Sequence, residues 1–94
     1  MKLVVAVVNR EDEEGVSRAL AERGLVATKI PSKGGFLDRE NTTFFIGVEE
    51  ERLSEVKALI LEKTRPRQLE LDGARLDLGG ATIFVLDVKE FLKL

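Results

Sequence analysis

The 94-residue sequence contains no cysteine and no histidine. The absence of cysteine excludes disulfide bonds, thiolate catalysis and zinc sites built on sulfur, and it fits a reducing compartment. The absence of histidine removes the commonest general base near neutral pH and the commonest metal ligand. We therefore expect no enzyme activity, no metal and no cofactor. An enzyme would have to use carboxylates or Lys29 and Lys33, and a pH-dependent turnover of a nucleotide would be needed to support that alternative.

The sequence also lacks a strong excess of charge and a long hydrophobic run. Fifteen Lys and Arg against 17 Asp and Glu give a net charge of −2, so no basic field would hold a nucleic-acid backbone. The apolar run Leu3–Val8 is much shorter than the roughly 20 residues that span a bilayer. We expect a cytoplasmic protein that binds no nucleic acid and does not insert into a membrane.

The composition is that of a folded protein, with 44% hydrophobic and 34% charged residues. Such a balance can bury a core, unlike the composition of a disordered segment. Ninety-four residues are about the size of one domain. The sequence therefore predicts a single domain over residues 1–94.

The pattern of apolar residues, helix caps and turn residues predicts the order of helices and strands. Asn9 is a good cap for a first helix, Pro31 should end the second strand with a loop over 32–35, and Asp72-Gly73 predicts a tight hairpin turn. The expected strands are 3–8, 25–30, 41–48 and 81–88, the helices about 11–23 and 49–63, and the hairpin 68–71 with 74–78. This order predicts an α+β, ferredoxin-like βαββαβ sandwich with a short hairpin before the last strand.

Three of the expected strands carry apolar residues on both alternating faces. They are Leu3–Val8, Thr43–Val48 and Ile83–Leu86. Two helices cover only one face of such a sheet, and a monomer rarely leaves a large apolar face exposed. We expect other copies of the chain to cover the second face. In the alternative, the C-terminal segment folds across it, although only about six residues follow the last strand.

The glycine pair Gly34-Gly35, followed by Phe36 and Leu37, joins two expected strands. Adjacent glycines let the backbone approach a ligand and turn its N–H groups toward an anion, and an aromatic ring can stack on a base. In the alternative, the glycines only form a turn and Phe36 packs into a core or a subunit interface.

Polar residues on two expected strands form a second candidate group. Asn41 can exchange paired hydrogen bonds with an adenine edge, and Thr42 and Thr43 follow it. On the preceding strand, the Thr28 hydroxyl and the Lys29 ammonium could meet phosphate oxygens. In the alternative, Asn41 caps a turn and the other residues are ordinary strand residues.

Several of these strings occur together, and their combination resembles a known family. The strings are MKLVVAVV (1–8), ATKI (27–30), GGFL (34–37), NTTF (41–44), IGV (46–48) and GGATIFV (79–85). They are similar to the cyclic-di-AMP receptor PstA family of PII-like, nitrogen-regulatory-type signalling proteins. The resemblance covers most of the chain and implies a homotrimer of ferredoxin-like subunits with ligand pockets between neighbouring subunits.

The resemblance also implies site residues. Thr28 and the backbone of 35–37 would lie near phosphate, Asn41 and Gly47 near adenine, and Phe36 and Leu37 would form apolar walls. The full implied ligand-binding set is Thr28, Gly34, Gly35, Phe36, Leu37, Asn41, Thr42 and Gly47.

We expect a PII-like signal-transduction protein that binds cyclic-di-AMP at subunit interfaces and relays this to an unidentified partner protein. Another adenine nucleotide, ATP or AMP, is the alternative ligand. A trimeric structural or interaction module without a small-molecule ligand is the alternative function.

Overall fold

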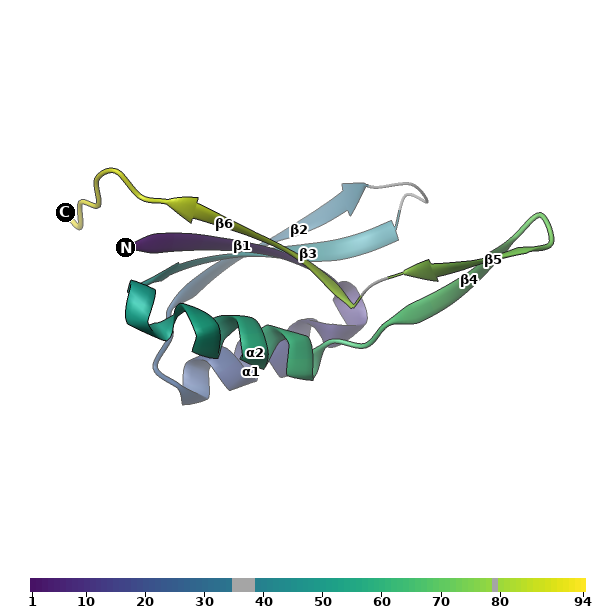
Figure 1. Ribbon diagram of the computed structural model, residues 1–94, viewed down its shortest axis with the longest axis horizontal. Coiled ribbons are helices and arrows are strands. Elements are labelled where there is room, and N and C mark those ends of the chain that lie inside the picture. Colours follow the sequence, from purple (N-terminus) through teal and green to yellow (C-terminus); the bar gives the residue numbers. More distant parts are fainter. Residues whose placement is uncertain (35–38, 79) are drawn as a thin grey trace.

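The chain folds into a four-stranded sheet with two helices packed on one face and a two-stranded ribbon that extends away from it (Figure 1). This computed structural model describes residues 1–34, 39–78 and 80–94. The elements are β1 (Lys2–Asn9), α1 (Glu13–Glu22), β2 (Ala27–Gly34), β3 (Arg39–Val48), α2 (Leu53–Lys63), β4 (Arg67–Leu71), β5 (Ala74–Leu78) and β6 (Ala81–Asp87), with short 3₁₀ turns η1 (Arg10–Asp12) and η2 (Glu50–Arg52) before the helices.

The strand order in the sheet is β2-β3-β1-β6, and every pair is antiparallel. β1 and β3 are central and β2 and β6 are the edges. The order of elements is βαββαβ, with β4 and β5 inserted before the last strand. This arrangement confirms the predicted α+β, ferredoxin-like fold.

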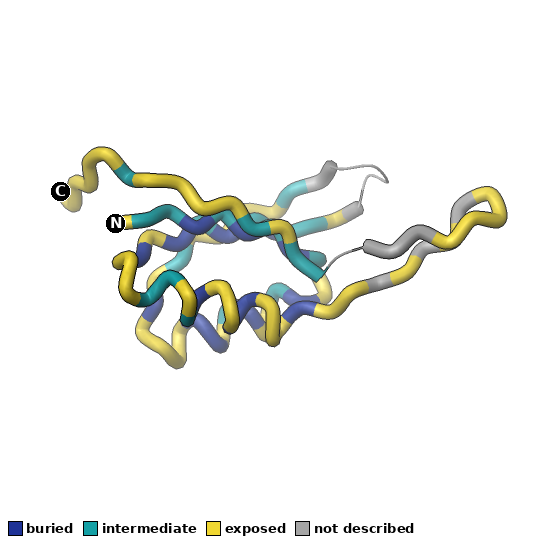
Figure 2. Tube along the Cα trace, viewed as in Figure 1, coloured by how far each residue is buried: buried dark blue, intermediate teal, exposed yellow. Residues whose placement is uncertain are grey.

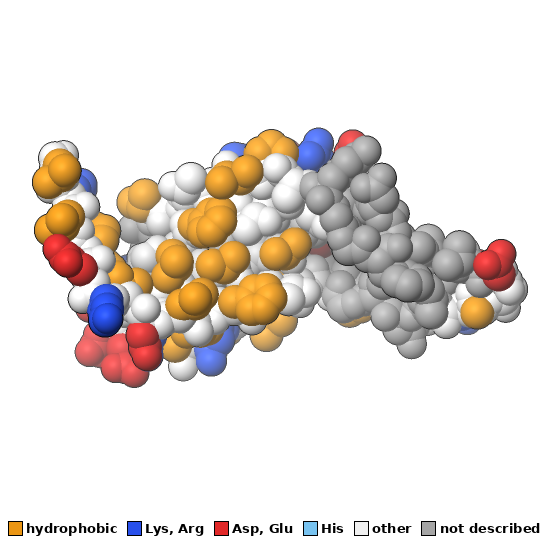
Figure 3. All heavy atoms as spheres, turned by 90° about the horizontal axis from the view of Figure 1, so that it is seen from above, with side chains coloured by type: hydrophobic (Ala, Val, Ile, Leu, Met, Phe, Trp, Pro, Cys, Tyr) orange, Lys and Arg blue, Asp and Glu red, His pale blue; other side chains and the backbone are white. Residues whose placement is uncertain are grey.

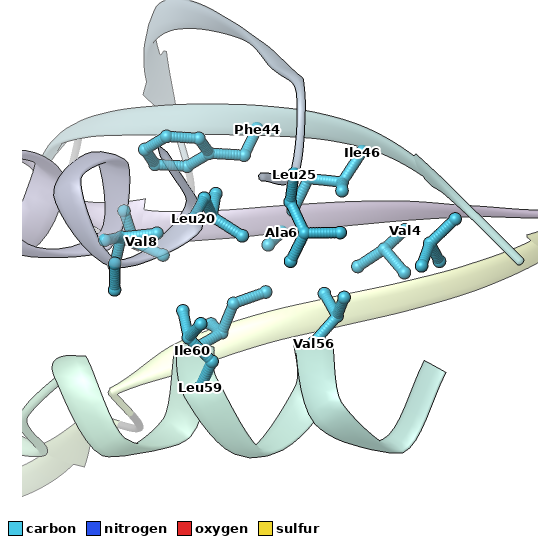
Figure 4. Close-up of a cluster of buried hydrophobic side chains, with 13 residues drawn as sticks. Val4, Ala6, Val8, Leu20, Leu25, Phe44, Ile46, Val56, Leu59 and Ile60 are labelled. Atoms are coloured by element: carbon cyan, nitrogen blue, oxygen red, sulfur yellow. The ribbon is translucent and has the colours of Figure 1, made fainter. Parts of the chain in front are cut away.

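The hydrophobic core lies between the sheet and the two helices (Figure 4). Alternate residues of β1 are buried, because successive side chains of a strand point to opposite faces. Figure 2 shows the buried positions concentrated between the two layers. The fully buried side chains include Val4, Val8, Val16, Leu20, Phe44, Ile46, Val56 and Ile60.

The predicted cap of the first helix is present. The Asn9 side-chain oxygen accepts a hydrogen bond from the Glu11 backbone N–H at 2.9 Å. The first turn after this cap is 3₁₀, however, so the α-helix begins at Glu13 rather than at residue 11. Tight 3₁₀ turns are common at helix ends and account for this difference.

The predicted end of the second strand is wrong. β2 does not stop at Pro31 but runs on to Gly34, and residues 32–34, expected to be loop, pair with β3. Proline cannot donate a ladder hydrogen bond, but β2 is an edge strand, where one side of the backbone needs no partner. Pro31 therefore does not end β2, because the strand lies at the edge of the sheet.

The predicted hairpin is present as the ribbon of β4 and β5. Asp72 and Gly73 form its turn with φ angles of 50° and 78°. At the base of the ribbon, Gly80 packs against the chain that enters it: a Cβ at Gly80 would lie 3.2 Å from the carbonyl carbons of Thr64 and Arg65. The Arg65 backbone N–H also donates to the Asp12 carboxylate at 3.3 Å. These contacts hold the two ends of the ribbon together beside η1.

Candidate functional site

The face of the sheet opposite the helices, here called the open face, is uncovered in the single chain. Figure 3 shows this face, with hydrophobic side chains spread across it. The alternation and the strand register place on it Leu3, Val5, Val7 and Asn9 of β1, Asn41, Thr43, Phe45 and Gly47 of β3, Thr28, Ile30 and Ser32 of β2, and Thr82, Phe84 and Leu86 of β6. None of these fourteen residues carries a charge.

The open face has an apolar centre. Phe84 is 55% exposed, and Ile30 and Leu86 are each 48% exposed. Between them lie the half-buried Val5 and Phe45 of the two central strands. Large apolar side chains gathered on one exposed face make it a candidate interaction surface, because monomers rarely leave large apolar patches in contact with water.

One end of the open face is polar. Ser32, Asn41 and Asn9 are consecutive partners across β2, β3 and β1. Thr43 lies in the adjacent row, and its hydroxyl is 3.1 Å from the hydroxyl of Ser32. This polar end adjoins the tip of the β2–β3 hairpin, whose last described pair is Gly34 with Arg39.

The structure brings several predicted site residues onto the open face. Thr28, Asn41 and Gly47 all lie there, and Gly34 is the last residue of β2. The remaining glycine-loop residues, Gly35, Phe36 and Leu37, lie outside the described residues. Their roles therefore stay predictions.

Asn41 and Gly47 lie toward opposite ends of β3. Six residues separate them on one strand, which corresponds to roughly 20 Å at about 3.3 Å per residue. Both residues of one chain cannot contact the same adenine. A site that uses both must take one from each of two copies of the chain.

Gly47 is exposed, and nothing within its own chain requires a glycine there. A Cβ would meet only the flexible Met1 side chain, at 3.8 and 3.9 Å, which is ordinary van der Waals contact, and its φ is not positive. A glycine inside a strand often marks close approach of a ligand or of another backbone. Here that group would have to come from outside the chain.

Two predicted polar residues point to the helix side instead. Thr42 is fully buried, and its hydroxyl oxygen has no hydrogen-bond partner among the described residues. Lys29 donates to the Ser17 hydroxyl at 3.3 Å and lies 3.5 Å from the Glu13 carboxylate of α1. Thr28 and Lys29 therefore lie on opposite faces of the sheet, because adjacent strand residues face opposite sides, and their expected contact with phosphate oxygens stays a prediction.

The marked electrostatic features lie on the helix side, away from the open face. Hydrogen bonds from Arg52, and then from Arg23, lower the pKa of Glu55 from 4.5 to about 2. A hydrogen bond from Lys2 on β1 lowers the pKa of Asp87 at the end of β6. Among the described residues no group of acidic side chains is placed to bind a metal ion. The fourteen residues named above thus suit apolar contact and neutral hydrogen bonds.

Ser32 and Asn9 were not singled out as site residues by the sequence reasoning. The composition of residues 32–35 predicts a loop there, after a strand that ends at Pro31. The alternation Thr28, Ile30, Ser32 is the signal that could have identified it, since it continues the open face through the proline.

No described helix has the length and hydropathy needed to cross a membrane.

Comparison with known proteins identifies relatives of the chain. A sequence model described as cyclic-di-AMP receptor matches residues 1–75. A solved structure from Pediococcus pentosaceus ATCC 25745, described as a functionally unknown protein, is 38% identical and superposes with a TM-score of 0.83. That match covers 99% of this chain and 96% of the other.

Proposed function

Because the chain belongs to the cyclic-di-AMP receptor family, we propose that it is a signalling protein that binds an adenine nucleotide between its subunits. Cyclic-di-AMP is the first candidate, and ATP or AMP the second. The proposed assembly is a homotrimer that relays binding to a partner protein in the cytoplasm.

The observation that carries this proposal is the open face, with its apolar centre and with candidate ligand contacts at both of its ends. Asn41 and Gly47 lie roughly 20 Å apart along β3, so the face supplies two half-sites rather than one site. Covering the apolar centre with neighbouring copies would bring the Asn41 end of one chain close to the Gly47 end of another. A trimer closes such unlike contacts into a ring.

The residues at the two ends suit a nucleotide. Asn41 offers an amide that can both donate to and accept from the adenine edge. Gly47 leaves room for a group to approach the strand closely. No step of this recognition requires a proton transfer or a nucleophile, so we propose a receptor and not an enzyme. The nucleotide would stabilise one conformation, which the partner then binds.

The proposal is tested by measuring the melting temperature with cyclic-di-AMP, cyclic-di-GMP, ATP, ADP and AMP. A ligand that binds only the folded state raises the melting temperature. We expect a rise with cyclic-di-AMP. A higher melting temperature with ATP or AMP alone would identify that nucleotide, rather than cyclic-di-AMP, as the ligand. An unchanged melting temperature with every nucleotide would contradict the proposal.

The substitution Asn41→Ala should abolish the response to cyclic-di-AMP and leave the trimer intact, because Asn41 lies at the polar end and outside the apolar centre. Titration calorimetry and light scattering measure the two properties. Ser54→Ala, an exposed position on α2, is the control and should retain both. Unchanged affinity of Asn41→Ala would show that the adenine is recognised elsewhere.

A protein-binding module without a small ligand is the second candidate. The observation that favours it is the ribbon of β4 and β5, which extends away from the sheet and helices (Figure 1). Ribbon edges can pair with a strand of another protein. This candidate would be preferred if the trimer forms and its stability responds to none of the nucleotides.

A further inference from the structure

Ser32 and Thr43 form a hydroxyl pair at the polar end of the open face. Their oxygens lie 3.1 Å apart on neighbouring strands, and both side chains are partly buried. Ser32 is also the cross-strand partner of Asn41. The pair therefore lies directly beside the residue proposed to contact adenine.

Hydrogen-bond counting shows that this pair has a donor left over. Each hydroxyl carries one hydrogen, and a single hydrogen bond between the two oxygens uses only one of them. The second O–H is free to donate to a third group. Two hydroxyls in contact thus hold one donor at a defined place on the sheet.

The pair lies at a boundary between polar and apolar side chains. Ile30 and Val7 flank Thr43 in its row, so the pair lies where the polar end meets the apolar centre. The nearby carboxylate of Glu40 belongs to the opposite face by alternation and lies 3.6 Å from the Arg10 guanidinium. No carboxylate among the described side chains of the open face would repel an anion there.

We propose that the Ser32–Thr43 hydroxyl pair donates a hydrogen bond to a phosphate oxygen of the bound nucleotide, while the adjacent Asn41 contacts its base. This inference rests on the proposed function and adds one phosphate contact to it. It also assigns the phosphate a hydrogen-bond donor that carries no charge.

The test measures the affinity for cyclic-di-AMP of the wild type, of Ser32→Ala with Thr43→Val, and of Ser32→Thr. A hydrogen bond to a charged group justifies an expected loss of about tenfold or more in the double variant. Ser32→Thr keeps the hydroxyl and should retain affinity within about threefold of the wild type. The melting temperature without ligand is measured for each, because the pair also links two strands.

A sulfur-substituted cyclic-di-AMP, with one non-bridging phosphate oxygen replaced, separates a phosphate contact from a structural role. If the pair contacts that oxygen, one diastereomer binds the wild type more weakly, and removing the hydroxyls then adds little further loss. An equal loss for the oxygen form and both sulfur forms would overturn the inference. The inference would also be overturned if the double variant bound cyclic-di-AMP as tightly as the wild type while Asn41→Ala abolished binding.

The outcome also distinguishes this inference from the proposed function. If the wild type binds no nucleotide, both fail. If the wild type and the double variant bind cyclic-di-AMP equally, only the role of the hydroxyl pair fails.

Discussion

At the scale of single residues, the string Asn41-Thr42-Thr43 shows how strand alternation divides neighbours between two environments. Asn41 and Thr43 lie on the open face, whereas Thr42 is fully buried beneath the helices. The motif predicts a polar ligand site, and the pairing register of β3 determines which of its residues face the open side of the sheet, where a ligand could bind. That division could be predicted only once the buried Phe44 and Ile46 fixed which face of β3 is the core.

The substitution Thr42→Val should raise the free energy of unfolding by about 1 kcal/mol, because it replaces an unpaired buried hydroxyl with a methyl group of the same shape. Urea denaturation measures the change. Thr43→Val is the control and should not stabilise, since its hydroxyl is paired with Ser32. A lower stability of Thr42→Val would mean that the hydroxyl has a partner in the assembled protein.

Glu55 predicts a pH dependence of stability. Arg52, then Arg23, lowers its pKa from 4.5 to about 2 in the folded chain, so the stabilisation from its carboxylate is present above pH 4.5 and is lost as the pH falls toward 2. Glu55→Gln should therefore be less stable than the wild type at pH 7, and the difference should shrink between pH 4.5 and 2.

Urea denaturation at low ionic strength measures this difference, because salt screens such an exposed group. Glu22→Gln, at the end of α1, is the control, and the difference between its free energy of unfolding and that of the wild type should not shrink over this pH range. A constant difference over this pH range would show that the ion pairs do not persist in solution.

At the scale of elements, most of the fold could be predicted, because each helix and each central strand carries its own periodic pattern. The course of β2 could not. Whether Pro31 ends a strand depends on its being at a sheet edge, and that is a property of the assembled sheet rather than of residues 27–34. The ribbon could be predicted from Asp72-Gly73 between the stretches 68–71 and 74–78, since few other residues adopt positive φ in a tight turn.

Two glycines should respond in opposite ways to alanine. Gly80→Ala should destabilise by about 1–3 kcal/mol, because its Cβ would lie 3.2 Å from backbone carbons of Thr64 and Arg65, which cannot move aside like a side chain. Gly15→Ala, in α1 with nothing within 4 Å of the added Cβ, should stabilise by about 0.5–1 kcal/mol. Urea denaturation of both variants provides the comparison, and a neutral Gly80→Ala would show that the ribbon base can relax.

At the scale of the whole molecule, the open face predicts the oligomeric state. Phe84→Glu would place a charge in the apolar centre, and burying an unpaired charge is strongly unfavourable. We expect the wild type to have about three times the 10.5 kDa chain mass in light scattering, and the variant to be monomeric. Leu61→Glu, at an equally exposed apolar position on α2, is the control and should remain trimeric. A trimeric Phe84→Glu would place the interface on another surface.

The ribbon of β4 and β5 extends along the longest axis of the molecule (Figure 1). The molecule measures 51 Å in its longest direction and 23 and 19 Å in the others. Five residues per strand give an arm of roughly 17 Å, so a rotation of about 20° at its base displaces the Asp72-Gly73 turn by roughly 6 Å. At this base, Gly80 packs closely on Thr64 and Arg65. The hydrogen bond from the Arg65 backbone N–H to Asp12 joins this base to η1, so a rotation here would move the tip of the ribbon farther than any residue at the base.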